Sequence, residues 1–473
     1  MDPSFNTRRK SIPSLTEYIW QKTPIMLPNE QYDKIALHRL VKTGITPKGV
    51  VFLCPRMAWS GESLMSNPPT DNYTRTENNT QTIYWANRGF DVYAIDYRTH
   101  FVPSNLNNSQ LSFLQNWNYD VWVSDIKEAV NKAKEVSGAG KVFMAGPSNG
   151  GGITMMYATK YWKADLRGII LIDALIFNGK APIAAKNNTG TNTYNLTKAL
   201  TDMVSMSTWS SSNIINPART KLALANPGAP AEDPPGTKLT PIINHLTNKP
   251  WTNITEWFTY TFQNAGSTNL YDGYGNITEV MQHMLAADPY TARRMTLEGE
   301  AISDWTNCPY LNYDFDDHFN EIDIPLLAFA SGPLYSNKTG TFQFINGIGN
   351  PDFTGIMLPK YGHTDVYMGV YSARDVSQPA LEWMLSHYQP PAASAFTNVT
   401  VMAGQTWYFF AHSAGSVGPI AYQWYEGNTM LQGQNSMLLP ITKTTAGTYT
   451  YTCKVTDSEG TTANSNTVTL AVK

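Results

Sequence analysis

The feature of this 473-residue chain that most limits its fold is an alternation of short strands with helices. Strand patterns rich in apolar residues occupy residues 48–54, 90–98 and 141–145. Helical patterns at residues 82–88 and 119–136 separate them. Apolar strands that alternate with helices form a parallel sheet covered on both faces. An α/β fold with a mostly parallel, doubly wound sheet is therefore predicted.

The alternation continues, is interrupted, and then resumes. Residues 166–173 predict another buried strand, whereas residues 178–320 lose the pattern and become rich in Asn, Pro and aromatic residues. So long a connection is uncommon in a compact domain unless it is itself folded, which predicts an inserted cap. Its aromatic residues could cover a site: Trp209, Trp251, Trp257, Phe258, Tyr260, Phe262 and Trp305. Strand patterns return at residues 324–330 and 355–358, and a helix at residues 373–386 closes the domain.

A second domain of a different class is predicted at the C-terminal end. The first domain spans residues 1–388, a proline-containing linker spans 389–394, and short alternating strands fill 395–473. Such strands, separated by turns and without helices, indicate an all-β sandwich.

Two aromatic residues give this sandwich a more specific character. Trp424, with Tyr449 downstream, resembles the strand C tryptophan and the tyrosine corner of immunoglobulin-like domains. Tyr451 stands where that pattern has its second cysteine, so core packing must replace the bridge. Attachment to a cell surface or a polymer is the role expected of this domain.

A serine occupies the junction of one strand with the following helix. Ser148 lies in Gly146-Pro147-Ser148-Asn149-Gly150-Gly151, directly after the strand at residues 141–145. Glycines allow a sharp turn that exposes the hydroxyl, and the helix directs its N-terminus at developing negative charge. Ser148 is therefore the predicted nucleophile.

A serine hydroxyl needs a base to act at neutral pH. His363 follows the strand at residues 355–358 in a glycine-containing turn, Lys360-Tyr361-Gly362-His363-Thr364-Asp365, from which it can reach Ser148. His363 is the predicted base.

The segment 86–98, the Ser148 turn and Gly362-His363-Thr364-Asp365 together resemble the α/β-hydrolase superfamily, over residues 32–388 apart from the cap. The resemblance implies an acid that orients His363. The usual position follows the strand at residues 324–330, but residues 330–337 contain no carboxylate. The other arrangement of the family favours Asp173, at the end of the next strand after Ser148, and Asp352 is the alternative.

The same resemblance implies an oxyanion hole made of backbone N–H groups. One donor is Asn149, the residue after the nucleophile. The other follows Cys54, and because Pro55 has no N–H, Arg56 or Met57 is expected to supply it.

Composition excludes several other classes. A net charge of −3 without a long basic stripe gives no reason to expect nucleic acid as a partner. No segment approaches 18 consecutive apolar residues, and the polar residues 1–10 are not expected to form a signal peptide. Few charged residues, 15% of the chain, favour a protein that is secreted or on the cell surface. No cofactor is expected. Three cysteines show no metal-ligand spacing, and 314–318 is read as a solvated acidic turn rather than a metal site.

The sequence thus predicts a secreted serine hydrolase that cleaves carboxylic esters, on small or polymeric substrates, through an acyl-enzyme on Ser148. Cleavage of amides or peptides by the same three residues is one alternative. A binding protein with an inactive hydrolase fold is the other.

Overall fold

The computed structural model describes the chain except for residues 1–6, 13, 28–31, 57–58, 66–74, 79, 104–105, 107, 175–216, 233–242, 245–248, 259–276, 286–315, 332–348, 388–391, 396–397, 415–420 and 458–459. The chain divides into two compact units, Met1–Trp383 and Met384–Lys473, and each is described by itself.

A nine-stranded sheet forms the centre of the first unit, in the order β1-β2-β3-β5-β4-β6-β7-β10-β11. The pairs from β5 to β11 are parallel, and those that join β1, β2, β3 and β5 are antiparallel. The prediction of a mostly parallel sheet is confirmed. The strands span Thr7–Ile12, Leu15–Lys22, Ile35–Lys42, Val50–Leu53, Asp91–Asp96, Val142–Pro147, Leu166–Ile172, Leu326–Ser331 and Phe353–Leu358, for β1 to β7, β10 and β11 respectively.

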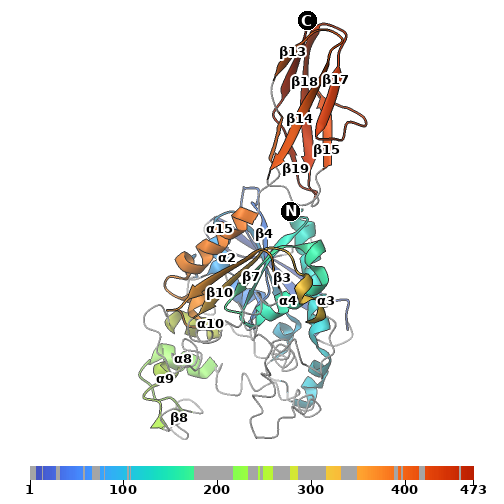
Figure 1. The fold of residues 1–473 in the computed structure, drawn as a ribbon. Helices are drawn as coiled ribbons and strands as arrows, with labels where there is room; N and C mark the ends of the chain where they lie inside the picture. Colours follow the sequence, from blue (N-terminus) through green and yellow to red (C-terminus); the bar gives the residue numbers. More distant parts are fainter. Residues whose placement is uncertain are drawn as a thin grey trace. The chain divides into compact units, whose positions relative to one another are not determined.

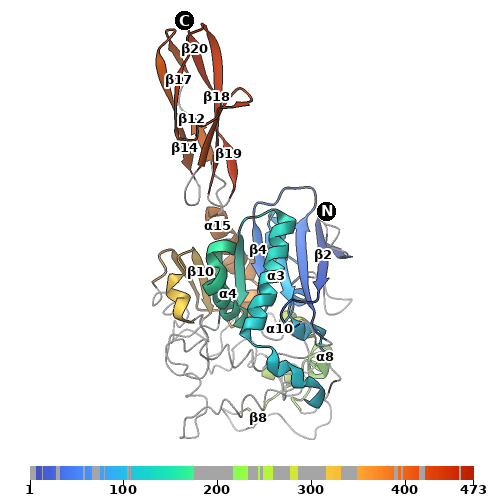
Figure 2. The ribbon, with the colours of Figure 1, turned by 90° about the vertical axis from the view of Figure 1, so that its right-hand side faces the viewer.

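Helices cover both faces of this sheet (Figures 1 and 2). Helices α3 (Tyr119–Ser137) and α4 (Asn149–Asp165) lie on one face, and α2 (Gln81–Asn87) and α15 (Gln378–His387) lie on the other. On this second face, the indole Nε1 of Trp85 in α2 donates to the Ser377 carbonyl at 2.9 Å, at the start of α15. The doubly wound arrangement is thus confirmed.

Local signals set the ends of the longest helix. The side chain of Asn118 caps α3 by accepting a hydrogen bond from the Val121 N–H at 3.1 Å. Gly138 ends the helix with φ at 71°, in the left-handed region that favours glycine. Between these ends, Val121, Ile126 and Val130 are buried against the sheet, which places the core beneath α3 and α4.

Only parts of the predicted cap lie among the described residues. They are α8 (Pro217–Ala225), β8 (Ile243–Asn244), β9 (Lys249–Pro250), α9 (Ile254–Phe258), α10 (Ile277–Leu285) and the 3₁₀ helix η5 (Asp316–Glu321). Trp251 is buried. Trp209, Tyr260, Phe262 and Trp305, and the side chains of Trp257 and Phe258, lie outside the described residues.

Two sheets make up the second unit. One has the order β12-β14-β17 and the other contains β13-β20-β18-β15-β16, with β19 on β18. Their buried side chains form one core, which is compatible with a sandwich. The strands span Ala392–Ala395, Val399–Val401, Thr406–Ala414, Ala421–Glu426, Thr429–Met430, Leu438–Thr442, Gly447–Thr456, Thr462–Asn464 and Val468–Val472, for β12 to β20 in order.

The predicted linker differs from the structure in one part. Ala392–Ala395, which includes three of the predicted linker residues, forms β12 and pairs with β14. Small residues after prolines favour a linker when read locally, whereas pairing with a strand distant in sequence decides the outcome here.

Aromatic packing replaces a bridge in the core of this unit. The rings of Phe409 on β14 and Tyr451 on β18 lie 5.3 Å apart beside the fully buried Trp424. The Tyr449 hydroxyl donates to the Thr445 carbonyl at 3.0 Å, the bond expected of a tyrosine corner. An immunoglobulin-like character stays a prediction that these contacts support.

Within the described parts of both units, no helix is long and apolar enough to cross a membrane.

Candidate active site

Ser148 stands at the sharp turn between β6 and α4, which end and begin at the adjacent residues Pro147 and Asn149. Its φ of 51° and ψ of −125° are strained for a residue with a side chain, at a cost on the order of 1–3 kcal/mol. A hydrogen bond of 3.0 Å from its N–H to the Ile172 carbonyl of β7 holds the turn in place. The strain places the hydroxyl beyond the end of the strand, at the positive end of α4.

Two glycines allow neighbouring backbones to approach this turn. A Cβ atom on Gly150 would lie 2.1 Å from the carbonyl oxygen of Cys54, and one on Gly146 would lie 2.4 Å from that of Gly150. Real Cβ contacts do not occur at such distances. The glycines therefore bring the start of α4 directly against the loop that follows β4.

His363 connects Ser148 with Asp173. His363 Nε2 lies 3.0 Å from Ser148 Oγ, and His363 Nδ1 lies 2.6 Å from Asp173 Oδ2. An ionised carboxylate can only accept, so Nδ1 carries a proton and Nε2 of the neutral ring accepts from the serine hydroxyl. Asp173 is fully buried, whereas the His363 side chain is 15% exposed. The structure thus brings together three predicted residues that lie far apart in sequence.

Ser331, at the end of β10, also holds the Asp173 carboxylate that His363 contacts. Its N–H donates to Asp173 Oδ1 at 2.6 Å and its hydroxyl donates to Asp173 Oδ2 at 2.8 Å. The backbone of Asp173 turns with φ at 47° directly after β7. Ser331 thus lies in the segment where the resemblance led us to expect the acid and where the sequence has no carboxylate. Its side chain instead donates a hydrogen bond to the acid that follows the neighbouring strand.

The turn that carries His363 is fixed by Asp365. The Gly362 N–H donates to Asp365 Oδ2 at 2.9 Å, and the Asp365 N–H donates back to the Gly362 carbonyl at 3.1 Å. Burial raises the pKa of the Asp365 carboxyl to about 6. Asp365 stands in the predicted motif, but sequence reasoning assigned it no role. The sequence feature that could have indicated this role is the spacing of Asp365 three residues after Gly362, which allows the carboxylate to close a turn.

Tyr367 in α14 (Asp365–Met368) packs beside the base. Its ring meets the His363 ring edge to face at 5.6 Å, and its hydroxyl donates to the Ile172 carbonyl at 2.9 Å. Nothing in the sequence pattern distinguished Tyr367 from the other tyrosines, because its position depends on the fold of the turn.

The predicted oxyanion donors Arg56 and Asn149 belong to segments that lie in contact. Asn149 is the first residue of α4, where helix geometry leaves the N–H without an acceptor inside the helix. Arg56 follows the Cys54–Pro55 carbonyls against which Gly150 packs. Met57, the other expected donor, lies outside the described residues.

Asp352, the alternative acid, lies at the wrong edge of the sheet. It is exposed and precedes β11, whereas Asp173 and Ser331 stand at the opposite, carboxyl ends of the parallel strands. Six residues at about 3.3 Å each put roughly 20 Å between the two edges. Asp352 therefore does not contact this group. Asp352 lies near His363 in sequence, but this does not place the two residues near each other in space.

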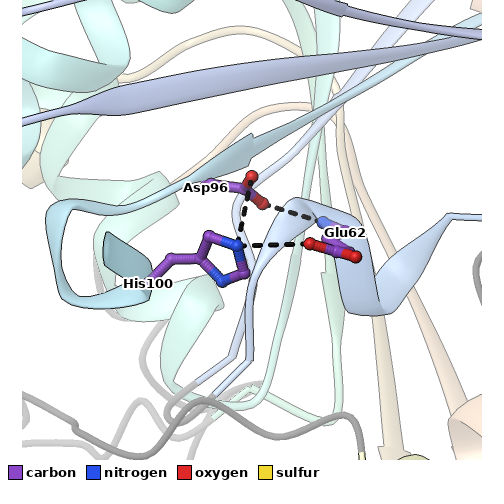
Figure 3. A group of neighbouring side chains, drawn as sticks. All are labelled: Glu62, Asp96 and His100. Atoms are coloured by element: carbon purple, nitrogen blue, oxygen red, sulfur yellow. Dashed lines mark hydrogen bonds and ion pairs between the residues drawn. The ribbon is translucent and has the colours of Figure 1, made fainter. Parts of the chain in front are cut away.

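A second polar group surrounds Asp96 (Figure 3). His100 Nε2 lies 3.2 Å from Glu62 Oε2 and 3.9 Å from Asp96 Oδ2. Both carboxylate oxygens of Asp96 already accept hydrogen bonds. The Glu62 N–H donates to one at 2.8 Å, and the buried His38 Nε2 donates to the other at 2.8 Å. These are ion-pair contacts that tie β3, β5 and α1 (Gly61–Leu64) together, and they leave Asp96 little capacity for a metal ion.

The acidic turn expected at residues 314–318 lies partly within η5. The His318 side chain is 41% exposed and its Nδ1 lies 2.7 Å from Glu321 Oε1. The side chains of the residues just before it lie outside the described residues.

Comparisons with known proteins give the following matches. Residues 72–214 match the model of the family described as "Serine aminopeptidase, S33". A candidate lipase from Sulfolobus solfataricus has a similar structure, with 28% identity and a TM-score of 0.56 over 79% of this chain and 95% of that one. An esterase from Exiguobacterium antarcticum gives 14% identity and a TM-score of 0.40 over 75% and 95%. No curated protein matches the chain.

Proposed function

We propose that this chain, a hydrolase of the α/β-hydrolase superfamily, cleaves carboxylic esters through an acyl-enzyme on Ser148. The observation that carries the proposal is the continuous set of hydrogen bonds from Ser331 through Asp173 and His363 to the hydroxyl of a strained Ser148. Strain at a single serine persists only where the surrounding structure imposes it, and it accumulates at functional sites.

The proposed acylation proceeds in two steps. Ser148 Oγ attacks the carbonyl carbon of the ester while its proton passes to His363 Nε2. The N–H group of Asn149 and that of Arg56 or Met57 stabilise the negative charge that forms on the carbonyl oxygen. Collapse of this intermediate breaks the bond to the alcohol oxygen, which takes the proton from His363. Asp173 stabilises the charged imidazole throughout and does not itself become protonated.

Water then completes the reaction. His363 removes a proton from a water molecule whose oxygen attacks the acyl carbon, and Ser148 Oγ leaves and is reprotonated by His363. The products are the free acid and the original enzyme, so the cycle needs no cofactor.

Peptide cleavage is the second candidate, because the matched family is described as a serine aminopeptidase. Removal of an N-terminal residue requires a site for the substrate's ammonium group. Among the described residues that line the cavity near Ser148, the one charged side chain is Arg56, a cation that repels an ammonium. This favours esters over aminopeptidase substrates. The predicted export of the protein, and attachment through the C-terminal domain predicted at residues 395–473, stay part of the proposal.

Two assays on the full chain test the proposed function. A fluorophosphonate probe is expected to label Ser148, as located by peptide mass, with no labelling of Ser148→Ala. p-Nitrophenyl butyrate is expected to be hydrolysed at least a hundredfold faster than aminoacyl p-nitroanilides. Failure to label the folded protein would falsify the enzyme hypothesis, and a preference for the anilides would move the assignment to the peptidases.

A further inference from the structure

The side chain of Arg56 is a buried cation without a counter-ion among the described residues. Arg56 is 6% exposed, and its Nη2 is buried without a hydrogen-bond partner. No carboxylate of the described residues forms an ion pair with it. Burial lowers the pKa of the guanidinium to about 10, and nearby Tyr367 offsets this only in part. A buried charge is costly unless it is paired and hydrogen-bonded, so this position requires an explanation.

Other buried arginines in the same unit are treated differently. Arg98 is fully buried, and its guanidinium donates to Asp125 at 2.7 Å from both Nε and Nη2 and to Asp33 at 2.8 Å from Nη1. These carboxylates raise the pKa of Arg98 in spite of its burial. Arg75 donates to two backbone carbonyls through Nη1. Its Nε and Nη2 are buried without a partner, and burial lowers its pKa to about 10 as well. Arg98 therefore has carboxylate partners, Arg75 has carbonyl partners at Nη1, and Arg56 has neither kind of partner in the hydrogen bonds of the described residues.

Aromatic rings compensate the charge of Arg56 only in part. Its guanidinium carbon lies 3.5 Å from the centroid of the Trp59 ring and 5.1 Å from that of Tyr367. Ring faces attract a cation, but they offer little to N–H groups that need a lone pair. This arrangement holds the guanidinium in place and leaves donors available for an incoming acceptor.

A cavity lies beside Arg56 and close to the nucleophile. It has a volume of about 30 Å³ and is lined in part by Arg56, Trp59, Thr80, Gln81, Pro147 and Tyr367. A single water needs roughly 10–15 Å³ of such volume, so a group somewhat larger than one water fits. Pro147 directly precedes Ser148, and the Tyr367 ring contacts His363. A ligand at this cavity is therefore a neighbour of the reacting atoms.

We propose that Arg56 forms an anion subsite that binds a carboxylate carried by the ester substrate. The inference deepens the proposed ester hydrolysis and rests on it. A guanidinium presents two parallel N–H donors that match the two oxygens of a carboxylate, and burial strengthens this pairing. The subsite selects substrates of which one part is acidic and the reacting carbonyl is an ester.

Matched pairs of esters test the preference. The acyl pair is p-nitrophenyl butyrate and mono-p-nitrophenyl succinate, which differ in one terminal carboxylate, and the alcohol pair is phenyl acetate and 4-carboxyphenyl acetate. The wild-type chain is expected to favour the acidic member of at least one pair by tenfold or more in kcat/KM. Arg56→Met is expected to bring that ratio to one or below, and Arg56→Lys, which keeps the charge but loses the fork, to an intermediate value.

The readout is the ratio of kcat/KM between the two members of a pair, measured within one variant. The backbone of Arg56 is itself a predicted donor of the oxyanion hole, so a substitution there can change both rates together. Arg374→Met is the matched control, since the Arg374 side chain is 62% exposed, and its ratio is expected to equal that of the wild type. Circular dichroism establishes that each variant is folded. Equal ratios in the wild type and Arg56→Met for both pairs would overturn the subsite while leaving ester hydrolysis intact.

A binding measurement distinguishes a subsite for the substrate from a site for free anions, and it does not depend on turnover. Calorimetry with folded Ser148→Ala is expected to show that the acidic ester binds at least tenfold more weakly once Arg56→Met is added. Acetate and chloride are expected to bind far more weakly than that ester. Acetate or chloride binding as tightly as the ester would make this a site for free anions and refute the substrate assignment. Labelling of Ser148 by the fluorophosphonate tests the proposed function separately.

Discussion

The hydroxyl of Ser331 donates to Asp173 Oδ2 at 2.8 Å, across the two neighbouring parallel strands β10 and β7. Ser331 stands where the resemblance led us to expect an acid, and Asp173 provides the carboxylate instead. The acid is displaced by one strand, and the residue at the vacated position helps to hold it.

Asp173→Asn is expected to lower kcat by about 10³–10⁴-fold, because an amide cannot hold the imidazole in the required tautomer or stabilise its charged form. Asp352→Asn serves as the control, since Asp352 is exposed at the opposite edge of the sheet, and its kcat should stay within twofold of wild type. Rates on p-nitrophenyl butyrate check both. A larger loss in Asp352→Asn would reject the assignment of Asp173.

Ser331→Ala removes one of the two hydrogen bonds that Ser331 gives to Asp173. A hydrogen bond to a charged group contributes on the order of 1.5–3 kcal/mol, so kcat is expected to fall by roughly tenfold or more. Ser331→Thr keeps the hydroxyl and should recover most of the activity. Steady-state kinetics at saturating ester provide the comparison, and an unchanged kcat in Ser331→Ala would show that the Ser331 hydroxyl does not support the acid.

Gly150→Ala is expected to abolish most of the activity, because the new Cβ would lie 2.1 Å from the Cys54 carbonyl oxygen and would force α4 away from the loop carrying Arg56. Gly152, in the same helix, has open space where a Cβ would stand, with no neighbouring atom within 4 Å, so Gly152→Ala is the matched control. It should stabilise the protein by about 0.5–1 kcal/mol and leave the rate near wild type. Thermal unfolding and ester hydrolysis are measured on both, and equal behaviour would contradict the close packing of the turn.

Stability is expected to depend on pH through His38, which lies buried between Glu17 and Asp96. Burial lowers the pKa of His38, but Asp96 and Glu17 outweigh that effect and raise the pKa to about 9. Arg75 also acts on Glu17, and His100 acts on Asp96. A pKa that is higher in the folded state gives stability that is complete below about 6.5 and is lost as pH rises through about 9.

His38→Leu tests this dependence. The variant leaves two buried carboxylates without their shared cation, which should cost about 3–5 kcal/mol in the free energy of unfolding near pH 6. The loss should be smaller at pH 10, where wild-type His38 is already neutral. Urea unfolding at both pH values measures it, with His318→Leu at an exposed histidine as the control. A loss of equal size at both pH values would exclude a charged His38.

The sequence predicted much of this fold because its signals were local. Apolar strands between helices identified β4 to β7, β10 and β11, and glycines around a serine identified the turn at Ser148. Strands β1 and β2 were not predicted. In β2 the buried face includes Glu17, whose partner His38 lies on the next strand, so the apolar alternation that indicates a strand is broken by a polar pair.

The site divides in the same way. His363 follows from a short motif. Asp173 was favoured over Asp352 because the superfamily that the sequence resembles has a second arrangement, with the acid at the end of this strand. The contributions of Ser331 and of the Arg56 side chain could not be predicted. Each depends on a residue far away in sequence: Ser331 donates to the distant Asp173, and Arg56 lacks an acceptor among the described residues. A missing counter-ion in particular leaves no pattern in a single sequence.

Strands β6 and β7 are direct neighbours in the sheet, with Pro147 opposite Ile172, so Ser148 and Asp173 extend from one continuous ladder of backbone hydrogen bonds. His363, by contrast, lies five residues beyond the end of β11. For enzyme engineering, this means that two of the three groups cannot be repositioned without rebuilding the central sheet. Directed evolution of the rate should therefore accumulate its useful substitutions around residues 360–367, which tune the remaining group.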